Sequence, residues 1–308
     1  MNPTGKCRLC NNHRELQHSH IIPKFVSDYQ KKTSATGYIR HSESINHRKQ
    51  DGLKEYLFCE ECEVRLNKWE TPTATHIFHP CNRREPMPYQ YDSWLLKFAV
   101  SISWRAMLHL QHLGQIQETK EASELVDHAM SVWHEYLLGE RPHPGKFEQH
   151  IILFDKINPV KGSDILERLP GNFNRFLMRG TDINQAHSKG HPLYIFTKMG
   201  RMGILGFIGL SHPKQWQGTK IHVEGGHIGG NVTLPANFFD YLIERAEQLQ
   251  MEHSKISAKQ RDKISKTFYK NQKQFLESEL YEAIIADIEM FGKKKTFRCS
   301  KKNRENLL

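Results

Sequence analysis

The sequence predicts a mixed α+β protein, in which a small N-terminal unit held by paired cysteines is followed by helices, an antiparallel sheet and further helices. Three observations predict this class. Two identical Cys-x-x-Cys pairs lie within the first 62 residues, helical periodicity runs through residues 92–138, and short strand-like segments between glycine-rich turns follow from residue 147. We expect three parts: a domain over residues 1–90, an accessory domain over 91–292 and a basic tail over 293–308.

Composition and charge narrow the function classes. The chain has 308 residues, of which 38% are hydrophobic, enough for a buried core and about two domains. The net charge of +10 suits polyanionic partners. The longest apolar run, Gly203 to Leu210, is much shorter than the about 18 residues of a membrane span, so we expect no transmembrane segment. The first ten residues lack the apolar stretch of a secretory signal, and we therefore expect a cytoplasmic protein with reduced cysteines.

Four of the six cysteines form two closely spaced pairs. Cys7 and Cys10 form the first, Cys59 and Cys62 the second, and 48 residues separate them. A spacing of two residues lets one tight turn direct both sulfurs at the same tetrahedral Zn²⁺, so the pairs predict a structural zinc site. Four ordinary buried cysteines are the alternative. A redox pair is disfavoured because no parallel βαβ pattern surrounds either pair.

The segments beside the cysteine pairs carry candidate catalytic residues. The segment from His18 to Pro23 predicts a short strand that ends at the proline and holds the imidazole of His20 on a rigid element. At the second pair, a strand leads into a helix on which Glu63, Asn67 and Glu70 share one face.

These segments resemble the zinc-stapled HNH, or His-Me finger, nucleases. The shared layout is a Cys-x-x-Cys pair, a strand with a catalytic His followed by Ile-Ile-Pro, and a second pair that opens a helix supplying a metal ligand. The resemblance covers residues 5–70. It implies a ββα-metal finger with a structural zinc on the four cysteines, His20 as the general base and Glu63 as a ligand of a catalytic Mg²⁺ or Mn²⁺. Asn67 is a further candidate on this helix, with a solvated surface residue as its alternative.

The chain departs from the family pattern at two positions. Ser19 stands where the family usually has an Asp or His that binds the metal, and Lys54 replaces the Asn that orients the base. His18, on the same strand face as the candidate base, is a candidate for the lost ligand. Asn46 or Asp51 is a candidate for orienting the base. The segment thus resembles an H-K-E variant of the H-N-H pattern.

The chemistry of phosphodiester hydrolysis fits this residue set. It requires a base that titrates near neutrality and a cation that neutralises charge on the phosphate. Histidine is such a base, and a carboxylate is a suitable oxygen ligand for Mg²⁺ or Mn²⁺. The residues therefore predict a one-metal nuclease. The alternative for His20 is local packing beside the zinc site, and for Glu63 it is a surface charge that complements the helix dipole.

The next part of the chain predicts scaffold. Residues 71–91 predict a linker or an irregular covering loop, in which Arg83 and Arg84 are candidate phosphate contacts or solvated charges. Apolar stripes predict helices over residues 92–112 and 118–138. The histidines of these helices show no metal-type grouping, and we interpret them as core-edge or surface residues.

A sheet and further helices are predicted beyond residue 147. The expected antiparallel strands cover residues 150–154, 193–197, 204–208, 219–223 and 231–234. The glycine cluster at 225–230 predicts a hairpin turn, and residues 237–292 predict helices. The basic residues that follow, Lys293, Lys294 and Lys295 among them, are candidates for DNA binding or for a solvated end.

The sequence thus predicts a metal-dependent endonuclease that hydrolyses DNA, with an accessory domain that selects the substrate or binds a partner. One alternative is a zinc-binding module that binds nucleic acid or protein without cutting. Another is a structural subunit in which the zinc only stabilises the fold. The layout also resembles nuclease subunits of bacterial restriction and antiphage defence, including the Zorya type. That resemblance implies a bacterial protein with other subunits of a defence system as partners.

Overall fold

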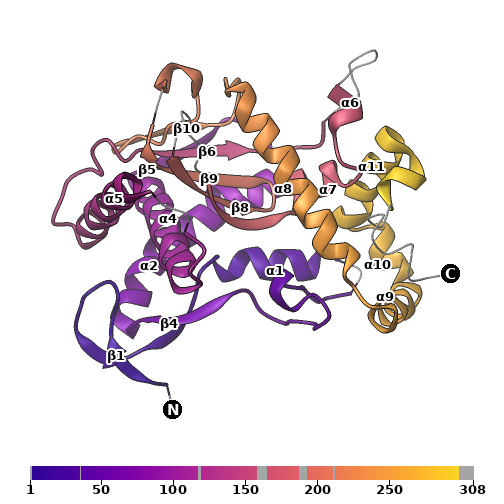
Figure 1. Cartoon of the computed structure of the whole chain (residues 1–308), viewed down its shortest axis with the longest axis horizontal. Coiled ribbons are helices and arrows are strands. Elements are labelled where there is room, and N and C mark those ends of the chain that lie inside the picture. The colour runs from indigo at the N-terminus through magenta and orange to yellow at the C-terminus, as the bar shows by residue number, and fades with distance from the viewer. Residues whose placement is uncertain are drawn as a thin grey trace. The chain divides into compact units, whose positions relative to one another are not determined.

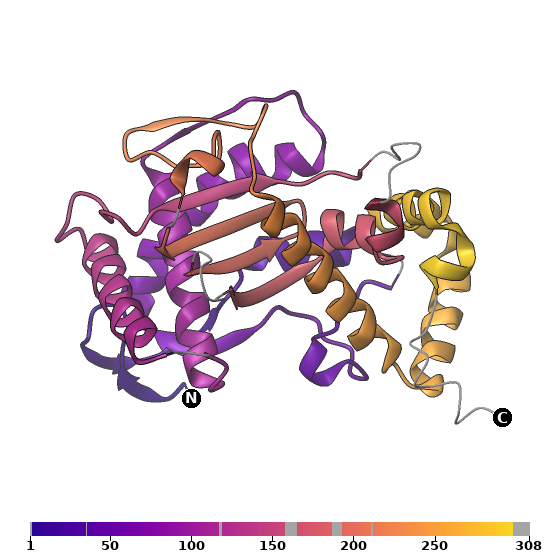
Figure 2. The same ribbon diagram turned by 45° about the horizontal axis from the view of Figure 1, so that its top comes forward.

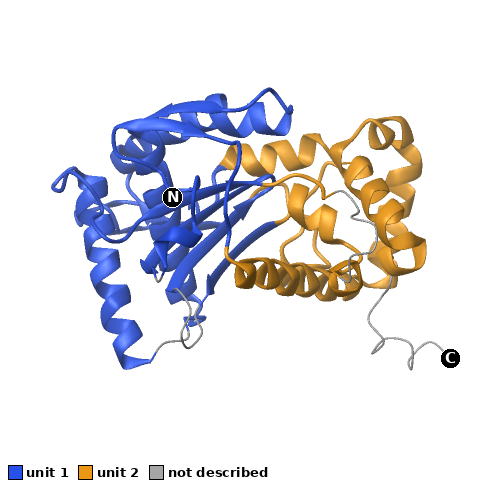
Figure 3. Cartoon of the chain, turned by 90° about the horizontal axis from the view of Figure 1, so that it is seen from above, with its two compact units in different colours: residues 1–23, 53–153, 181–234 blue, residues 24–52, 154–180, 235–308 orange. Residues whose placement is uncertain are grey.

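The computed structural model describes residues 2–34, 36–116, 119–157, 165–186, 193–210 and 212–297. Its fold class is mixed α+β, as the sequence predicts (Figure 1). The chain forms two compact units, each assembled from separate segments (Figure 3). Unit 1 comprises residues 1–23, 53–153 and 181–234, and unit 2 comprises residues 24–52, 154–180 and 235–308. The expected boundaries at residues 90 and 292 lie inside unit 1 and unit 2, respectively.

Unit 1 begins with two small antiparallel pairs of strands. The first joins β1 (Thr4–Lys6) to β2 (His13–Glu15), and the second joins β3 (Gln17–His20) to β4 (Lys54–Phe58). Helix α2 (Glu60–Thr73) follows β4 directly. Three glutamates in its first turn complement the positive end of the helix dipole, which favours the start of the helix at this point.

The prediction of an irregular segment over residues 71–91 is wrong for its first half. Helix α2 continues into the π-helical turn η2 (Ala74–Phe78) and helix α3 (His79–Asn82), and strand β5 (Tyr89–Asp92) follows after a short connection. Pro72 lies inside α2, where it removes a backbone donor and disfavours a regular helix. Ile77 and Phe78 are fully buried, and their packing outweighs this local preference.

The two helices predicted from apolar stripes are confirmed as α4 (Trp94–His112) and α5 (Lys120–Leu138). Thr119 caps α5 by accepting a hydrogen bond from the amide of Ala122, and α5 ends at Gly139, whose φ is 87°. Helix α4 is buried over most of its length because it packs against the sheet of unit 1.

That sheet has four antiparallel strands in the order β6-β9-β8-β7 (Figure 2). Its members are β6 (Gln149–Leu153), β7 (Thr181–Ala186), β8 (Leu193–Met199) and β9 (Met202–Gly209). Three of them were predicted, whereas the polar edge strand β7 was not. Gly206 allows the close approach of α4, because a Cβ at this position would lie 2.4 Å from Oγ of Ser103.

The remaining strand predictions of unit 1 need correction. The residues at 219–223 and 231–234 form no strand; the former contribute only an isolated bridge between His150 and Lys220. The glycine cluster, predicted as a turn, contains strand β10 (Gly225–Ile228), which pairs with β5. A Cβ on Gly225 would lie 2.5 Å from the carbonyl oxygen of Tyr91, so only glycine allows this approach. The short 3-10 turn η3 (Pro213–Gln215) precedes this region.

Unit 2 is helical, and the C-terminal helices predicted from the sequence are confirmed. It contains the short 3-10 turn η1 (Ser42–Ser44) and the helices α1 (Lys24–Lys32), α6 (Ile165–Arg168), α7 (Phe173–Arg179), α8 (Ala236–Ser254), α9 (Ala258–Lys270), α10 (Gln272–Leu276) and α11 (Glu279–Thr296). Helix α7 packs against both α8 and α11. The buried carboxylate of Asp287 accepts hydrogen bonds from the amide of Asn174 and from Nε of Arg175, which joins α11 to the start of α7.

Glu148, next to the first residue of β6, gives a prediction about acid stability. Its carboxylate accepts hydrogen bonds from His150 and Lys220, which together lower its pKa from 4.5 to about 2. A carboxylate with a depressed folded pKa stabilises the protein above its unfolded pKa, and this contribution disappears as the pH falls from about 4.5 to about 2. We expect Glu148→Gln to reduce the free energy of unfolding by about 1–2 kcal/mol at pH 7, after allowance for solvent screening, and by much less at pH 3.

Urea denaturation at both pH values measures this difference. Glu140→Gln is the matched control, because Glu140 is an exposed glutamate of the same unit. If Glu148→Gln lowered the free energy of unfolding equally at pH 7 and pH 3, the assigned role of the carboxylate would be contradicted.

Candidate active site

The four paired cysteines come together in unit 1. Cys7 and Cys10 lie in the turn between β1 and β2, while Cys59 precedes α2 and Cys62 lies in its first turn. Their sulfurs all lie within 4.8 Å of one another, and Sγ of Cys10 is 3.8 Å from Sγ of Cys59. A tetrahedron with Zn–S bonds of about 2.3 Å has S–S edges of about 3.8 Å. This group can bind a metal ion and is compatible with a structural zinc.

The local backbone builds this site. Asn11 adopts a left-handed φ of 61°, and the turn closes through hydrogen bonds from the amide of Asn11 to Cys7 and from the amide of Cys7 to Asn12. The amide of Cys59 donates to Sγ of Cys7 at 3.3 Å, which links the second cysteine pair to the first. Each pair therefore presents its sulfurs from a tight turn, as the spacing predicts.

Burial makes an uncompensated set of thiolates unfavourable here. Burial opposes ionisation of Cys7, but the backbone amides of Cys10 and its neighbours outweigh this effect and lower the pKa of Cys7 from 9.0 to about 7. Burial raises the pKa of Cys59 and of Cys62, and contacts with neighbouring sulfurs add to the rise at Cys62. Four thiolates in this space require a cation, and a divalent zinc supplies the compensating charge.

The antiparallel pair of β3 and β4 carries the candidate base; residues 21–53 connect the two strands, and we refer to the pair as the β3–β4 hairpin. His20 faces Lys54 across the hairpin, and His18 faces Tyr56, so both histidines lie on one face of the strand. His20 is half-buried and ends β3, whereas His18 is exposed and stacks on Tyr56 with ring centroids 4.7 Å apart. The structure thus places Lys54 directly opposite His20.

Helix α2 carries the candidate metal ligand and packs against β3. Glu63 is half-buried, and among the described residues its Oε1 atom is buried without a hydrogen-bond partner. Leaving a buried carboxylate oxygen unpaired costs about 1–3 kcal/mol or more, and a bound cation would remove this cost. Asn67, one turn later, is exposed and accepts a hydrogen bond from the hydroxyl of Thr71 at 3.2 Å. Glu63 therefore fits a hard cation such as Mg²⁺ or Mn²⁺ better than Asn67 does.

Arg105 supports the end of β3, a contact that the sequence analysis missed. Its side chain is 2% exposed, donates from Nη1 to the carbonyl oxygen of His20 at 2.9 Å, and forms an ion pair with Glu70 at 2.8 Å. The guanidinium thereby connects α4, α2 and the last residue of β3. In the sequence, this contact was indicated only by an arginine within the apolar stripe of a predicted helix, because a buried charge requires hydrogen-bond or ion-pair partners.

The opposite face of the hairpin is anchored by a second group of polar residues. Ser19 is buried and faces Glu55 across the two strands. The carboxylate of Glu55 contacts Nδ1 of His109 and lies 3.0 Å from Nδ1 of His112, both on α4. These histidines thus hold β4 against α4. In the described ranges, the cysteines form the one group of three or more metal-type side chains whose ligand atoms lie close together.

Asn46 and Asp51, in the segment that connects β3 to β4, were candidates for orienting the base. Asn46 instead uses its side chain within unit 2, where Oδ1 accepts from the amide of Ser257 at 2.7 Å and Nδ2 donates to the carbonyl of Lys255 at 3.4 Å. Oδ1 of Asp51 accepts from the amide of Gly52 at 2.9 Å. Both side chains are therefore engaged locally.

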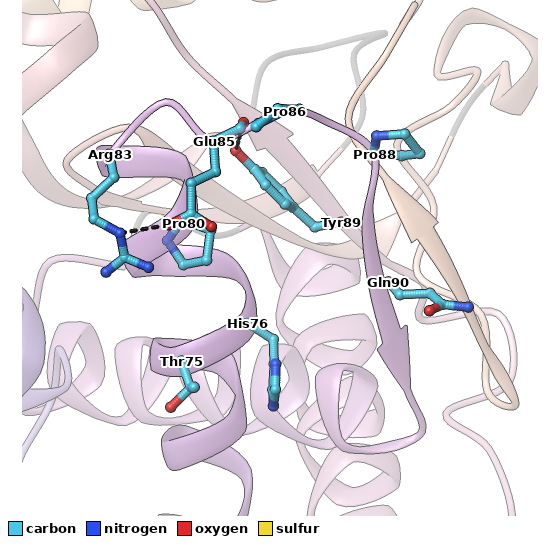
Figure 4. A pocket seen from close by; sticks show the side chains of 9 residues that line it. All are labelled: Thr75, His76, Pro80, Arg83, Glu85, Pro86, Pro88, Tyr89 and Gln90. Atoms are coloured by element: carbon cyan, nitrogen blue, oxygen red, sulfur yellow. Dashed lines mark hydrogen bonds and ion pairs between the residues drawn. The ribbon is translucent and has the colours of Figure 1, made fainter.

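The candidate phosphate contacts lie in separate places. Arg83 lines an open groove of about 410 Å³ together with His76 and Tyr89, and its Nε pairs with Glu85 at 2.6 Å (Figure 4). Arg84 follows with a φ of 56°. Lys293, Lys294 and Lys295 lie at the end of α11 in unit 2. Lys295 donates to the carbonyls of Leu166 and Glu167, both at 3.3 Å, and the other two are exposed. The basic residues beyond 297 lie outside the described part of the chain.

Comparisons of the chain with protein-family models, with curated proteins and with solved structures give no match. None of the described helices combines the length and the apolar character that crossing a bilayer requires.

Proposed function

We propose that the chain is a metal-dependent endonuclease of the HNH type, in which β3, β4 and α2 form a ββα-metal finger. The observation that carries the proposal is the orphaned buried carboxylate oxygen of Glu63, on the helix that starts at the second cysteine pair and packs against the strand of His20. A cation held by Glu63, with His18 as a candidate second ligand, would neutralise charge on the scissile phosphate and the leaving oxygen.

The side chains of the hairpin supply the remaining chemistry. The imidazole of His20 accepts a proton from the attacking water, and its position depends on the strand end that Arg105 holds through the His20 carbonyl. Lys54, opposite His20, stands where the HNH pattern has an asparagine. A lysine cannot accept a hydrogen bond from an imidazole N–H as an amide oxygen does. Backbone fixation by Arg105 therefore takes over part of the orienting role in this proposal.

DNA is the proposed substrate, supported by the net charge of +10. Action within a bacterial defence system, together with other subunits, is proposed from the resemblance of the His18–Pro23 and Cys59–Glu63 segments alone. The competing function is a zinc-binding module that binds nucleic acid or protein without cutting. Ser19 favours this competing function, because it stands where the HNH pattern has a metal ligand and has no carboxylate or imidazole. Its side chain is buried, and its hydroxyl donates to the carbonyl of Gln17.

Plasmid cleavage tests the proposed function. We expect purified protein to nick or linearise supercoiled DNA in Mg²⁺ or Mn²⁺ and to leave it intact in EDTA. Glu63→Gln should reduce the rate at limiting metal by at least about 10-fold, because an amide binds a hard cation more weakly than a carboxylate. Raising the metal concentration should restore part of the rate.

Glu60→Gln is the matched control for this experiment, since Glu60 is an exposed glutamate in the same helical turn. We expect it to cut like the unaltered protein. Cleavage in EDTA, or equal metal dependence of the two variants, would exclude the assigned role of Glu63. Salt-sensitive DNA binding with no cleavage in any metal would favour the non-cutting module.

A further inference from the structure

Helix α9 and its flanks form a strongly basic segment of unit 2. Between Lys255 and Lys273 there are seven Lys or Arg residues and one acid, Asp262, a net of +6 within a chain of +10. These residues belong to unit 2 and lie outside the candidate active site. This helix and its two ends are thus one of two strongly basic segments, the other being residues 293–304 with seven Lys or Arg and no acid.

The lysines of this helix are arranged as a single stripe. Lys259, Lys263, Lys266 and Lys270 follow one another at intervals of four, three and four residues, which places them on one helical face. All four are exposed, as is Lys273 in the following helix α10. At a rise of 1.5 Å per residue, the four lysines span about 16 Å along the helix axis. We refer to Lys259, Lys263, Lys266 and Lys270 as the lysine stripe.

A neighbouring face of α9 is held by the loop between residues 39 and 49. Nη2 of Arg48 donates to the carbonyl of Lys263 at 3.2 Å and lies 3.3 Å from Oγ1 of Thr267, while Arg40 donates to Gln260 at 3.2 Å. The apolar residues Ile264 and Phe268 are half-buried on this side, and no residue of α9 is fully buried. The loop therefore holds the helix in place while the lysine stripe faces solvent.

Little negative charge faces the stripe. Among the described ion pairs, Asp262 with Lys266 at 2.8 Å is the one that involves a lysine of the stripe, and both of these side chains are more than half exposed. Such an exposed pair contributes little and is readily exchanged for a stronger anionic partner. The stripe is therefore a nearly uncompensated row of point charges.

We propose that the lysine stripe binds the phosphate backbone of double-stranded DNA without reading its sequence. This inference rests on the proposed function for the identity of the polyanion and adds a substrate-holding surface distinct from the active site. A regular row of ammonium groups matches the regular row of phosphates along a strand, and lysine binds phosphate as a point charge with no geometric demand on the bases. An anionic membrane fits less well, because the apolar residues Ile264 and Phe268 of α9 are half-buried, and Phe268 packs on Phe275 of α10.

Binding to a fluorescent duplex of about 25 base pairs tests the stripe directly, measured by anisotropy over a range of salt concentrations with no Mg²⁺ or Mn²⁺ added. Leaving out these ions removes cleavage from the readout and keeps the zinc in place, so binding is measured whether or not the protein is a nuclease. The test variant replaces the four lysines of the stripe with Gln. The control variant replaces four exposed lysines from other elements with Gln and so loses the same charge: Lys32, Lys120, Lys146 and Lys214.

We expect the stripe variant to bind at least about 10-fold more weakly than the control variant near 100 mM salt. Its slope of log affinity against log salt should decrease by about 3.6, since each of the four lost phosphate contacts removes about 0.9. Circular dichroism of both variants checks that the helices persist. Equal affinities and salt slopes of the two variants would overturn the proposal, as would wild-type binding to anionic phosphatidylserine vesicles without binding to the duplex. A stripe-dependent affinity in a protein that cuts DNA in no metal would support this surface while excluding the proposed catalysis.

Discussion

His20→Ala is expected to reduce metal-dependent DNA cleavage by about 10²- to 10⁴-fold, the range that a positioned general base contributes. The variant should keep its zinc, because the metal-type group consists of the four cysteines and His20 lies on the adjacent strand. Arg105 should retain its hydrogen bond, since it contacts the backbone carbonyl of His20 and not the imidazole. The expected result is therefore an inactive protein with an intact fold, measured as a single-turnover plasmid cleavage rate at matched zinc content.

His13→Ala is the matched control, because His13 is an exposed histidine on strand β2 of the same unit. It should cut at the rate of the unaltered protein. The two variants should have the same thermal transition, which separates loss of chemistry from loss of structure. Cleavage by His20→Ala at the unaltered rate, per bound zinc, would remove His20 from the mechanism.

The parts of the site that the sequence predicted depend on local spacing. A Cys-x-x-Cys pair forms its own turn, so Cys7 and Cys10 present their sulfurs together wherever the pair lies in the fold. Pro23 follows the end of β3, and the glutamates after Cys59 favour a helix start, so the strand and helix positions also follow from neighbouring residues. The unpaired, buried oxygen of Glu63 could not be predicted from local spacing, since burial of a single atom depends on the packing of the whole unit.

The parts that the sequence did not predict depend on long-range contacts. Arg105 reaches His20 across 85 positions, and its position in an apolar stripe gave no indication of which backbone atom it would bind. The strand over Gly225–Ile228 exists because β5, far earlier in the chain, accepts it as a partner. At Ile77 and Phe78, tertiary burial overrides the helix-breaking tendency of Pro72. Local propensity predicts neither a partner strand nor a buried face.

The zinc site gives the prediction with the largest effect on stability. Cys59→Ser should lose the bound metal and unfold the N-terminal segments of unit 1, because Cys59 joins the first turn to α2 through its sulfur and through its amide contact with Cys7. Structural zinc sites contribute about 10–16 kcal/mol of apparent binding free energy, which equals or exceeds the about 5–15 kcal/mol by which most domains are stable. The strands β1 and β2 have three residues each and exposed side chains, so they have little hydrophobic core of their own.

Zinc content by atomic absorption and limited proteolysis across residues 1–70 measure this outcome. The expected result is less than one zinc per chain and rapid cleavage near the N-terminus, with the same pattern in unaltered protein treated with a strong chelator. Cys81→Ala is the control, because Cys81 is a buried cysteine outside the group of four. It removes a buried thiol but no ligand, so it should keep the zinc and lose only about 1–2 kcal/mol. If Cys59→Ser retained the zinc and resisted proteolysis as well as Cys81→Ala does, Cys59 would be an ordinary core residue and not a metal ligand. The contacts of β3 with α2 and of β4 with α4 would then position His20 without help from Cys59.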